Sequence, residues 1–174
     1  MKKSEVIKNL INGKIVAIFQ GASEWGPRAL GNRSILFDPR NPNAKDIVNK
    51  VKKREWYRPF AGTIMLEHAN DYFEMATIKE SPYMSFAIPA KQKAIEEVPG
   101  IIHVDGTCRI QTVTRQQNKN FYDLIEEFYK QTKVPILFNT SFNLAGEPLV
   151  ETIEDAIDTV DRSDIDILYI PDNV

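Results

Sequence analysis

The sequence predicts one α/β domain with a twisted mixed β-sheet flanked by helices. Strand-like segments rich in apolar and β-branched residues alternate with segments of helical periodicity, which is the pattern of α/β folds. Residues 108–113 follow a Gly106-Thr107 turn and are expected to pair with residues 101–105 as an antiparallel hairpin, which would make the sheet mixed. The length of 174 residues allows one domain with a proper core and is too short for two comfortable ones.

The first half of the chain supplies helices and strands in alternation. Ser4 is expected to cap a helix whose apolar residues share one face, and the Asn12-Gly13 pair ends it. Pro27 suits the first turn of a short helix, because the N–H that it lacks has no partner there. The other elements expected here are strands at residues 14–19, 34–37 and 61–66 and helices at residues 44–54 and 67–74.

The second half begins with a stretch of weak periodicity, residues 77–100. It contains an expected strand at residues 83–88 and a charged segment at residues 91–97 that we expect to be mobile and close to a site. Asn120 is expected to cap the clearest helix, which has a core-facing apolar stripe. The stripe comprises Phe121, Leu124, Ile125 and Phe128. The remaining expected elements are strands at residues 134–138 and 167–170 and a helix that ends near Asp161 and is opened by a capping box of Thr152 and Asp155.

Composition excludes several classes of protein. The net charge of −2 is wrong for a general nucleic-acid coat, so nucleic acid is not expected as a partner. One cysteine, Cys108, rules out an internal disulfide, and with only two histidines in the chain no protein-held metal site is expected. No apolar run approaches the roughly 18 residues needed to span a bilayer, so we expect no membrane partner and a cytoplasmic location.

Cations gather beside glycine, proline and aromatic residues in three places. Arg28 and Arg33 lie in the segment 24–34 among two glycines and a proline, a setting that suits either anion binding or a turn whose arginines pair with surface carboxylates. The run 52–60 adds Lys52, Arg54 and Arg58, and Arg109 follows another glycine turn. In an acidic-leaning chain this repetition favours the binding of one polyanion.

Two further groups are candidates for chemistry. Ser141 and Asn143 are short polar residues after a buried strand, where α/β folds place ligands, and with the cations they could hold a nucleotide triphosphate. Neither Gly-x-x-x-x-Gly-Lys-Ser/Thr nor Gly-x-Gly-x-x-Gly is present. His103 and Asp105 are expected on one face of an extended segment, as a base or ligand pair or as a hydrogen-bonded structural pair. The aromatic residues of the second cluster could stack a purine, although core packing is expected for at least two of Trp56, Tyr57 and Phe60.

Four motifs in this order resemble the carboxyl-terminal domain of the NodU- and CmcH-type O-carbamoyltransferases. They are EWGPRALGNRS at residues 24–34, KREWYRPFA at residues 53–61, HVDGTCRIQT at residues 103–112 and NTSFNLAGEP at residues 139–148. The resemblance extends over residues 13–170 and implies that residues 1–174 form one domain with a YrdC-like fold. The ATP-binding signature of that domain, Lys-x-Arg with a distant Ser-x-Asn, is matched by Lys52, Arg54, Ser141 and Asn143.

The resemblance implies an adenylylation that uses ATP, Mg²⁺ and carbamoyl phosphate. Carbamate from carbamoyl phosphate attacks the α-phosphorus of ATP and gives carbamoyl adenylate and pyrophosphate. The residues expected to bind the nucleotide and the phosphates are Arg28, Arg33, Lys52, Arg54, Arg109, Ser141 and Asn143. Those expected to act in catalysis are Lys52, Arg54, Arg58, His103 and Asp105, with His103, Asp105 and Arg109 on the far wall of the pocket.

Full-length members of that family carry a large amino-terminal domain of the actin and sugar-kinase type, which transfers the carbamoyl group to an acceptor hydroxyl. That domain is not expected in this chain, so complete transfer would need a transferase domain in trans or a homodimer. Two other interpretations stay open. One is a YrdC-type synthase that uses bicarbonate, threonine and ATP for tRNA modification, and the other is a non-catalytic nucleotide- or RNA-binding module.

Overall fold

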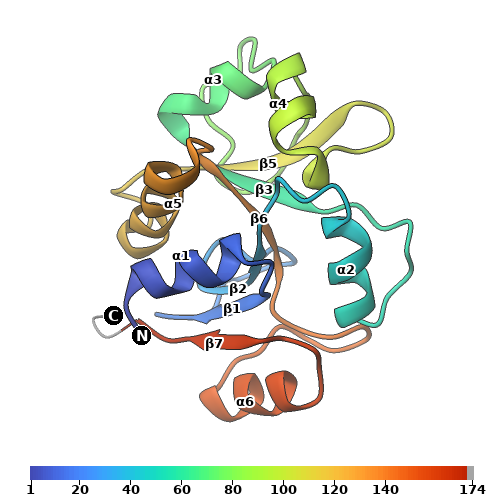
Figure 1. Ribbon diagram of the computed structural model, residues 1–174, viewed down its shortest axis with the longest axis vertical. Helices are drawn as coiled ribbons and strands as arrows, with labels where there is room; N and C mark the ends of the chain where they lie inside the picture. Colours follow the sequence, from blue (N-terminus) through green and yellow to red (C-terminus); the bar gives the residue numbers. More distant parts are fainter. Residues whose placement is uncertain (172–174) are drawn as a thin grey trace.

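A single mixed sheet runs through the centre of the molecule (Figure 1). The computed structural model describes residues 1–171, and within them seven strands follow the order β4-β5-β3-β6-β2-β1-β7. The strands are β1 (Val16–Phe19), β2 (Arg33–Phe37), β3 (Ala61–Met65), β4 (Ala87–Pro89), β5 (Thr107–Val113), β6 (Ile136–Ser141) and β7 (Ile167–Tyr169). The helices are α1 (Lys3–Ile11), α2 (Ala44–Val51), α3 (Ala69–Tyr72), α4 (Gln92–Glu97), α5 (Lys119–Thr132) and α6 (Ile153–Asp161), with short 3₁₀ turns η1 (Leu66–His68) and η2 (Pro99–Ile101).

The pairing of the strands makes the sheet mixed, as the sequence predicts. β3 pairs with β5 and β1 with β7 in parallel, while β6 runs antiparallel to both of its neighbours, β2 and β3. β6 therefore lies inside the sheet, and its first three residues, Ile136, Leu137 and Phe138, are fully buried. A β-carbon on Gly62 of β3 would lie 2.5 Å from Cδ1 of Ile101, so glycine lets Ile101 of η2 pack closely on the sheet.

Helices cover the sheet on opposite sides. Figure 1 shows α1 and α5 side by side, with α2 across β6 from them. The stripe of α5 is fully buried, as the sequence predicts, and burial of each such side chain contributes about 1.5–3 kcal/mol. No helix within residues 1–171 is long and apolar enough to cross a membrane.

Most expected elements are confirmed with small shifts at their ends, but the strand expected at residues 83–88 is present only at its end, as β4. The capping box of α6 is present: the Asp155 N–H donates to Thr152 Oγ1 at 3.2 Å and the Thr152 N–H to Asp155 Oδ2 at 2.9 Å. α5 is capped by Asn118 in place of Asn120, and α1 begins before Ser4, at Lys3. α2 stops at Val51, three residues short of the expected end.

Three expectations are wrong. Residues 101–105 form no strand, because Ile101 packs over Gly62 and the chain then turns tightly, the His103 N–H donating to the Thr107 carbonyl at 2.8 Å. Pro27 opens no helix, and residues 20–32 form an irregular loop. The charged segment expected to be mobile forms α4, which is anchored by fully buried Ala94.

Candidate functional site

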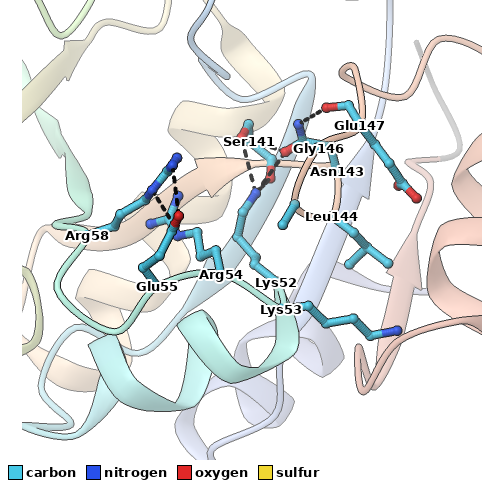
Figure 2. A pocket seen from close by; sticks show the side chains of 11 residues that line it. Lys52, Lys53, Arg54, Glu55, Arg58, Ser141, Asn143, Leu144, Gly146 and Glu147 are labelled. Atoms are coloured by element: carbon cyan, nitrogen blue, oxygen red, sulfur yellow. Dashed lines mark hydrogen bonds and ion pairs between the residues drawn. The ribbon is translucent and has the colours of Figure 1, made fainter.

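The larger of two neighbouring polar cavities, about 660 Å³, lies between the loop after α2 and the loop after β6 (Figure 2). The first loop contributes Lys52, Arg54 and Arg58, and the second contributes Ser141 and Asn143. The structure therefore brings together the two halves of the Lys-x-Arg and Ser-x-Asn pair, which are separated by 89 residues between Lys52 and Ser141.

Lys52 ties the two loops together. Its side chain is inside the protein, with the residue 2% exposed, and its ammonium donates to the carbonyl and hydroxyl of Ser141 and, at 2.8 Å, to Asn143 Oδ1. In return the Ala145 N–H donates to the Lys52 carbonyl at 2.9 Å. None of the three acceptors carries a charge, so burial, with a smaller effect of the cation Arg54, lowers the pKa of Lys52 from 10.5 to about 7. A buried ammonium without a counter-ion favours the entry of an anion.

Arg54 is held in place by neutral groups. Its Nε donates to Asn49 Oδ1 at 2.6 Å, and its guanidinium lies 4.0 Å above the Phe60 ring. Asn49 also donates to the carbonyls of Trp56 and Arg58, which fixes the loop. Burial, followed by the nearby cation Arg58, lowers the pKa of Arg54 to about 10. Arg54 thus remains charged at neutral pH and is held in a defined position.

The second cavity, about 210 Å³, shares Arg54, Arg58 and Ser141 with the first. It adds two more guanidinium groups, those of Arg28 and Arg109. Burial and then the proximity of Arg28 lower the pKa of Arg109. The single carboxylate among the linings that pairs with these arginines is Glu55, whose Oε2 lies 2.7 Å from Arg58 Nε within the described part of the chain. Such an excess of positive charge is suited to a small anion.

Arg33, expected to bind phosphate, lies elsewhere. It is 3% exposed, it lines neither cavity, and its guanidinium donates to four backbone carbonyls at 2.7–3.3 Å while lying 3.6 Å above the Phe19 ring. The carbonyls belong to Gln20, Gly21, Asn32 and Glu151. Burial lowers its pKa. The structure therefore gives Arg33 a role in holding the loop in place of the expected contact with a phosphate.

His103 and Asp105 also lie outside the two cation-lined cavities. They line a separate hollow of about 220 Å³ on the other side of Phe60. Because residues 103–107 form a turn, the two side chains do not share one face of a strand: His103 Nε2 lies 3.1 Å from the Phe60 carbonyl, and Asp105 accepts from Thr107. The Thr107 hydroxyl and N–H lower the pKa of Asp105. The structure does not bring this pair to the expected wall of the pocket.

The aromatic residues of the second cluster also differ from expectation. Trp56 and Tyr57 are 72% and 63% exposed, and only Phe60 packs in the core, so the expectation that at least two of the three are buried is wrong. Cys108 is fully buried and free, as expected of an apolar strand residue, and burial raises its pKa to about 12.

Sequence reasoning missed two buried asparagines, Asn49 and Asn139. Asn49 orders the loop that carries Arg54, and Asn139 lines the smaller cavity. Asn139 could have been found from strand alternation, because it lies two residues before Ser141 and therefore on the same face of β6. Asn49 lies within a helix and gives no comparable signal.

Comparison with known proteins gives consistent results. The family described as Carbamoyltransferase C-terminus matches residues 7–174. The nodulation protein NolNO of Sinorhizobium fredii is 46% identical over 163 residues, which cover 92% of this chain and 24% of that protein. Nodulation protein U of the same species is 40% identical over 143 residues, covering 82% of this chain and 25% of that protein. The chain thus spans about a quarter of the length of these relatives.

Solved structures share the fold. Full-length HypF in its phosphate- and nucleotide-bound form superposes with a TM-score of 0.70 at 22% identity, over 98% of this chain and 25% of HypF. A variant of Sua5 from P. abyssi superposes with a TM-score of 0.65 at 13% identity, over 98% of this chain and 49% of Sua5. These likenesses confirm the YrdC-like fold implied by the sequence motifs.

Proposed function

The chain belongs to the carbamoyltransferase C-terminus family, and from this premise we propose that it activates a carbamoyl group with ATP. The proposed products are carbamoyl adenylate and pyrophosphate, formed from ATP and from the carbamate that carbamoyl phosphate supplies. Transfer of the carbamoyl group to an acceptor hydroxyl is proposed for another domain, such as the remainder of the longer relatives, acting in cis, in trans or across a homodimer.

The observation that carries this proposal is that two cation-lined cavities of different size adjoin each other. The larger one has room for a nucleotide, the smaller one suits a small anion, and Arg54, Arg58 and Ser141 line both. A reaction that joins a small anion to the α-phosphorus of a nucleotide needs such an arrangement, because the two reacting atoms must lie about 3–3.5 Å apart. The similar HypF structure is described as phosphate- and nucleotide-bound, which supports the use of a nucleotide by this chain.

The triphosphate is proposed to lie over Lys52, Ser141 and Asn143. The ammonium of Lys52 would exchange part of its contact with Ser141 and Asn143 for a phosphate oxygen, which also restores a counter-ion to a buried cation. Arg54, held by Asn49 and Phe60, is positioned between the two cavities to neutralise the phosphate under attack. Arg28 and Arg109 are proposed to bind the carbamate.

The proposed reaction has two steps. Water hydrolyses carbamoyl phosphate to carbamate and phosphate. A carbamate oxygen then forms a bond to the α-phosphorus of ATP, the bond from that phosphorus to the bridging oxygen of the β-phosphate breaks, and pyrophosphate leaves with the electron pair. Fixed cations are the main requirement for such a step, because charge is spread over the phosphoryl oxygens in the transition state.

Mg²⁺ fits this site as a companion of the nucleotide. The carboxylates at the larger cavity, Glu55 and Glu147, are each paired with an arginine, and within residues 1–171 no group of three acidic, histidine or cysteine side chains is placed to hold a metal ion. Phosphate oxygens and water would therefore supply most of the ligands, as is usual for this ion. When bound, Mg²⁺ would neutralise phosphate charge.

The test is pyrophosphate release by the purified chain with Mg²⁺-ATP, with and without carbamoyl phosphate, together with mass detection of carbamoyl-AMP. We expect release that depends on carbamoyl phosphate. Parallel reactions with bicarbonate and threonine test the rival synthase, and release in those reactions alone would overturn the proposal. ATP binding without pyrophosphate in any reaction would favour a binding module or a site completed by another domain.

A further inference from the structure

The lining of the smaller cavity includes a buried, uncharged amide, that of Asn139. It belongs to β6, it is 1% exposed, and it lines the cavity together with Ala61 and Arg109. Its Nδ2 donates to the carbonyl of Ala29 at 3.2 Å, to Thr63 Oγ1 at 2.9 Å and to Gln111 Oε1 at 3.3 Å.

These partners fix the orientation of the amide. The Ala29 carbonyl can only accept, and Gln111 must present Oε1 because its Nε2 donates to the Leu30 carbonyl at 3.0 Å. An Asn139 turned the other way would direct its oxygen at two acceptors. The oxygen Oδ1 therefore has one possible direction, and it is buried there without a donor among the described residues. Native proteins seldom leave a buried acceptor unpaired, so this oxygen needs an explanation.

A second buried group without a partner lies in the same row of the sheet. Arg109 of β5 is in register with Ala61 of β3, and Ala61 is in register with Asn139 of β6, so the three side chains leave the same face. Nε of Arg109 is buried and has no acceptor among residues 1–171. Ala61, which carries only a methyl group, lies between an unpaired donor on one side and an unpaired acceptor on the other. A complementary ligand is small, with an acceptor oxygen at one end and an N–H at the other.

We propose that Asn139 selects the carbamoyl group by accepting a hydrogen bond from its amino group, while Arg109 binds its oxygen. This assignment rests on the proposed function and adds a specificity-determining residue to it. A group with methyl in place of the amino group would leave Oδ1 unpaired. Asn139 would then discriminate against acetyl groups that the arginines alone would accept.

The test compares the binding of carbamoyl phosphate and acetyl phosphate by calorimetry, because the two differ only in NH₂ against CH₃. We expect the wild-type chain to bind carbamoyl phosphate about 10- to 100-fold more tightly, since a site built to bond an N–H rejects the analogue that lacks it. Equal affinities in the wild-type chain would overturn the proposal without any variant having to fold.

Two variants sharpen the comparison. Asn139→Leu keeps a similar volume and is expected to bind both compounds within about twofold of each other, because the acceptor is lost. Thr63→Val removes one partner of Asn139 and retains Oδ1, so it is the matched control and is expected to keep the preference. A preference that survives in folded Asn139→Leu, or disappears in folded Thr63→Val, would contradict the assignment.

Pyrophosphate release separates this proposal from the one on which it rests. A wild-type chain that prefers carbamoyl phosphate and releases no pyrophosphate would retain the role of Asn139 in recognition and overturn the adenylylation. Release of pyrophosphate without the preference would do the reverse.

Discussion

The two arginine-bearing loops of this domain resemble each other in sequence and differ in how they use their charges. In the loop before β2, the Glu24 carboxylate accepts from three backbone N–H groups and Arg33 donates to four carbonyls, so the charges hold the loop itself. In the loop after α2, neutral Asn49 holds the backbone and Arg54 and Lys52 line a cavity. Arg33 therefore stabilises its own loop, whereas the cations of the second loop line a cavity.

The largest expected effect is the loss of stability when Arg33, which holds the first loop, is replaced. Arg33→Met should lower the free energy of unfolding by about 3–5 kcal/mol and the Tm by about 10 °C, because four carbonyls lose a charged donor. Thermal and denaturant unfolding measure this change.

Arg28→Met is the matched control from the same loop. The side chain of Arg28 lines the smaller cavity and has a hydrogen bond only to the neighbouring Pro27 carbonyl among the described residues. We expect the free energy of unfolding of Arg28→Met to stay within about 0.5 kcal/mol of the wild type, and the variant to bind carbamoyl phosphate more weakly. If Arg28→Met is less stable than Arg33→Met, the conclusion that Arg33 stabilises this loop is contradicted.

The next effect concerns the pH dependence of stability that buried Lys52 imposes. Its pKa is about 7 in the folded chain and close to 10.5 when unfolded, so between these values the unfolded chain binds more protons. Stability of the wild type relative to Lys52→Met should therefore rise with pH from 7 to 10.5, by up to about 5 kcal/mol, and stay level below pH 7.

Denaturant unfolding of both proteins across that pH range tests the prediction. Taking the difference cancels the titration of groups that the two proteins share. Lys53→Met, which removes the exposed neighbouring lysine, controls for the loss of one positive charge from the chain. A constant difference between wild type and Lys52→Met would show that the ammonium has a counter-ion or solvent that the structure does not contain.

The third expected effect is on the binding of ATP by Arg54 in the second loop. Arg54→Met should weaken ATP binding about 10- to 100-fold, because a charge-assisted hydrogen bond contributes about 1.5–3 kcal/mol. The methionine retains the apolar contact with Phe60 but leaves the buried Asn49 Oδ1 without its donor, so a loss of about 1–3 kcal/mol in stability is expected as well. Calorimetric titration with ATP measures the affinity, and an unchanged Kd would remove Arg54 from the nucleotide site.

Much of the fold could be predicted from the sequence because apolar periodicity records burial directly. The stripe of α5 and the run of β6 are examples, since both face the core. The expected strand at residues 101–105 was wrong for a reason outside its own sequence: the space above Gly62 on a different strand accepts Ile101. Periodicity cannot report a partner that is distant in the chain.

The site could be predicted in composition and less well in arrangement. Lys52, Arg54, Ser141 and Asn143 do line one cavity, as the family resemblance implies. Arg33 and His103 carry the right chemistry for such a site and lie outside it, because local backbone carbonyls bind one and a turn redirects the other. Asn139 opens a polar run in the sequence, and only the register of β3, β5 and β6 places it in one row with Ala61 and Arg109.

The smallest effect tests whether Glu24 and Arg33 hold the first loop as one unit. Glu24→Gln replaces a carboxylate that accepts from the N–H groups of Leu30, Asn32 and Arg33 by a neutral acceptor. We expect a loss of about 1 kcal/mol, since charge-assisted hydrogen bonds are roughly twice as strong as neutral ones. Because both residues order the same loop, the second substitution should cost less in an Arg33→Met background than in the wild type, as a double-mutant cycle of unfolding free energies would measure. Additive effects would mean that the loop is ordered by each residue independently, and the contrast with the neutral, Asn49-held loop would then rest on Arg33 alone.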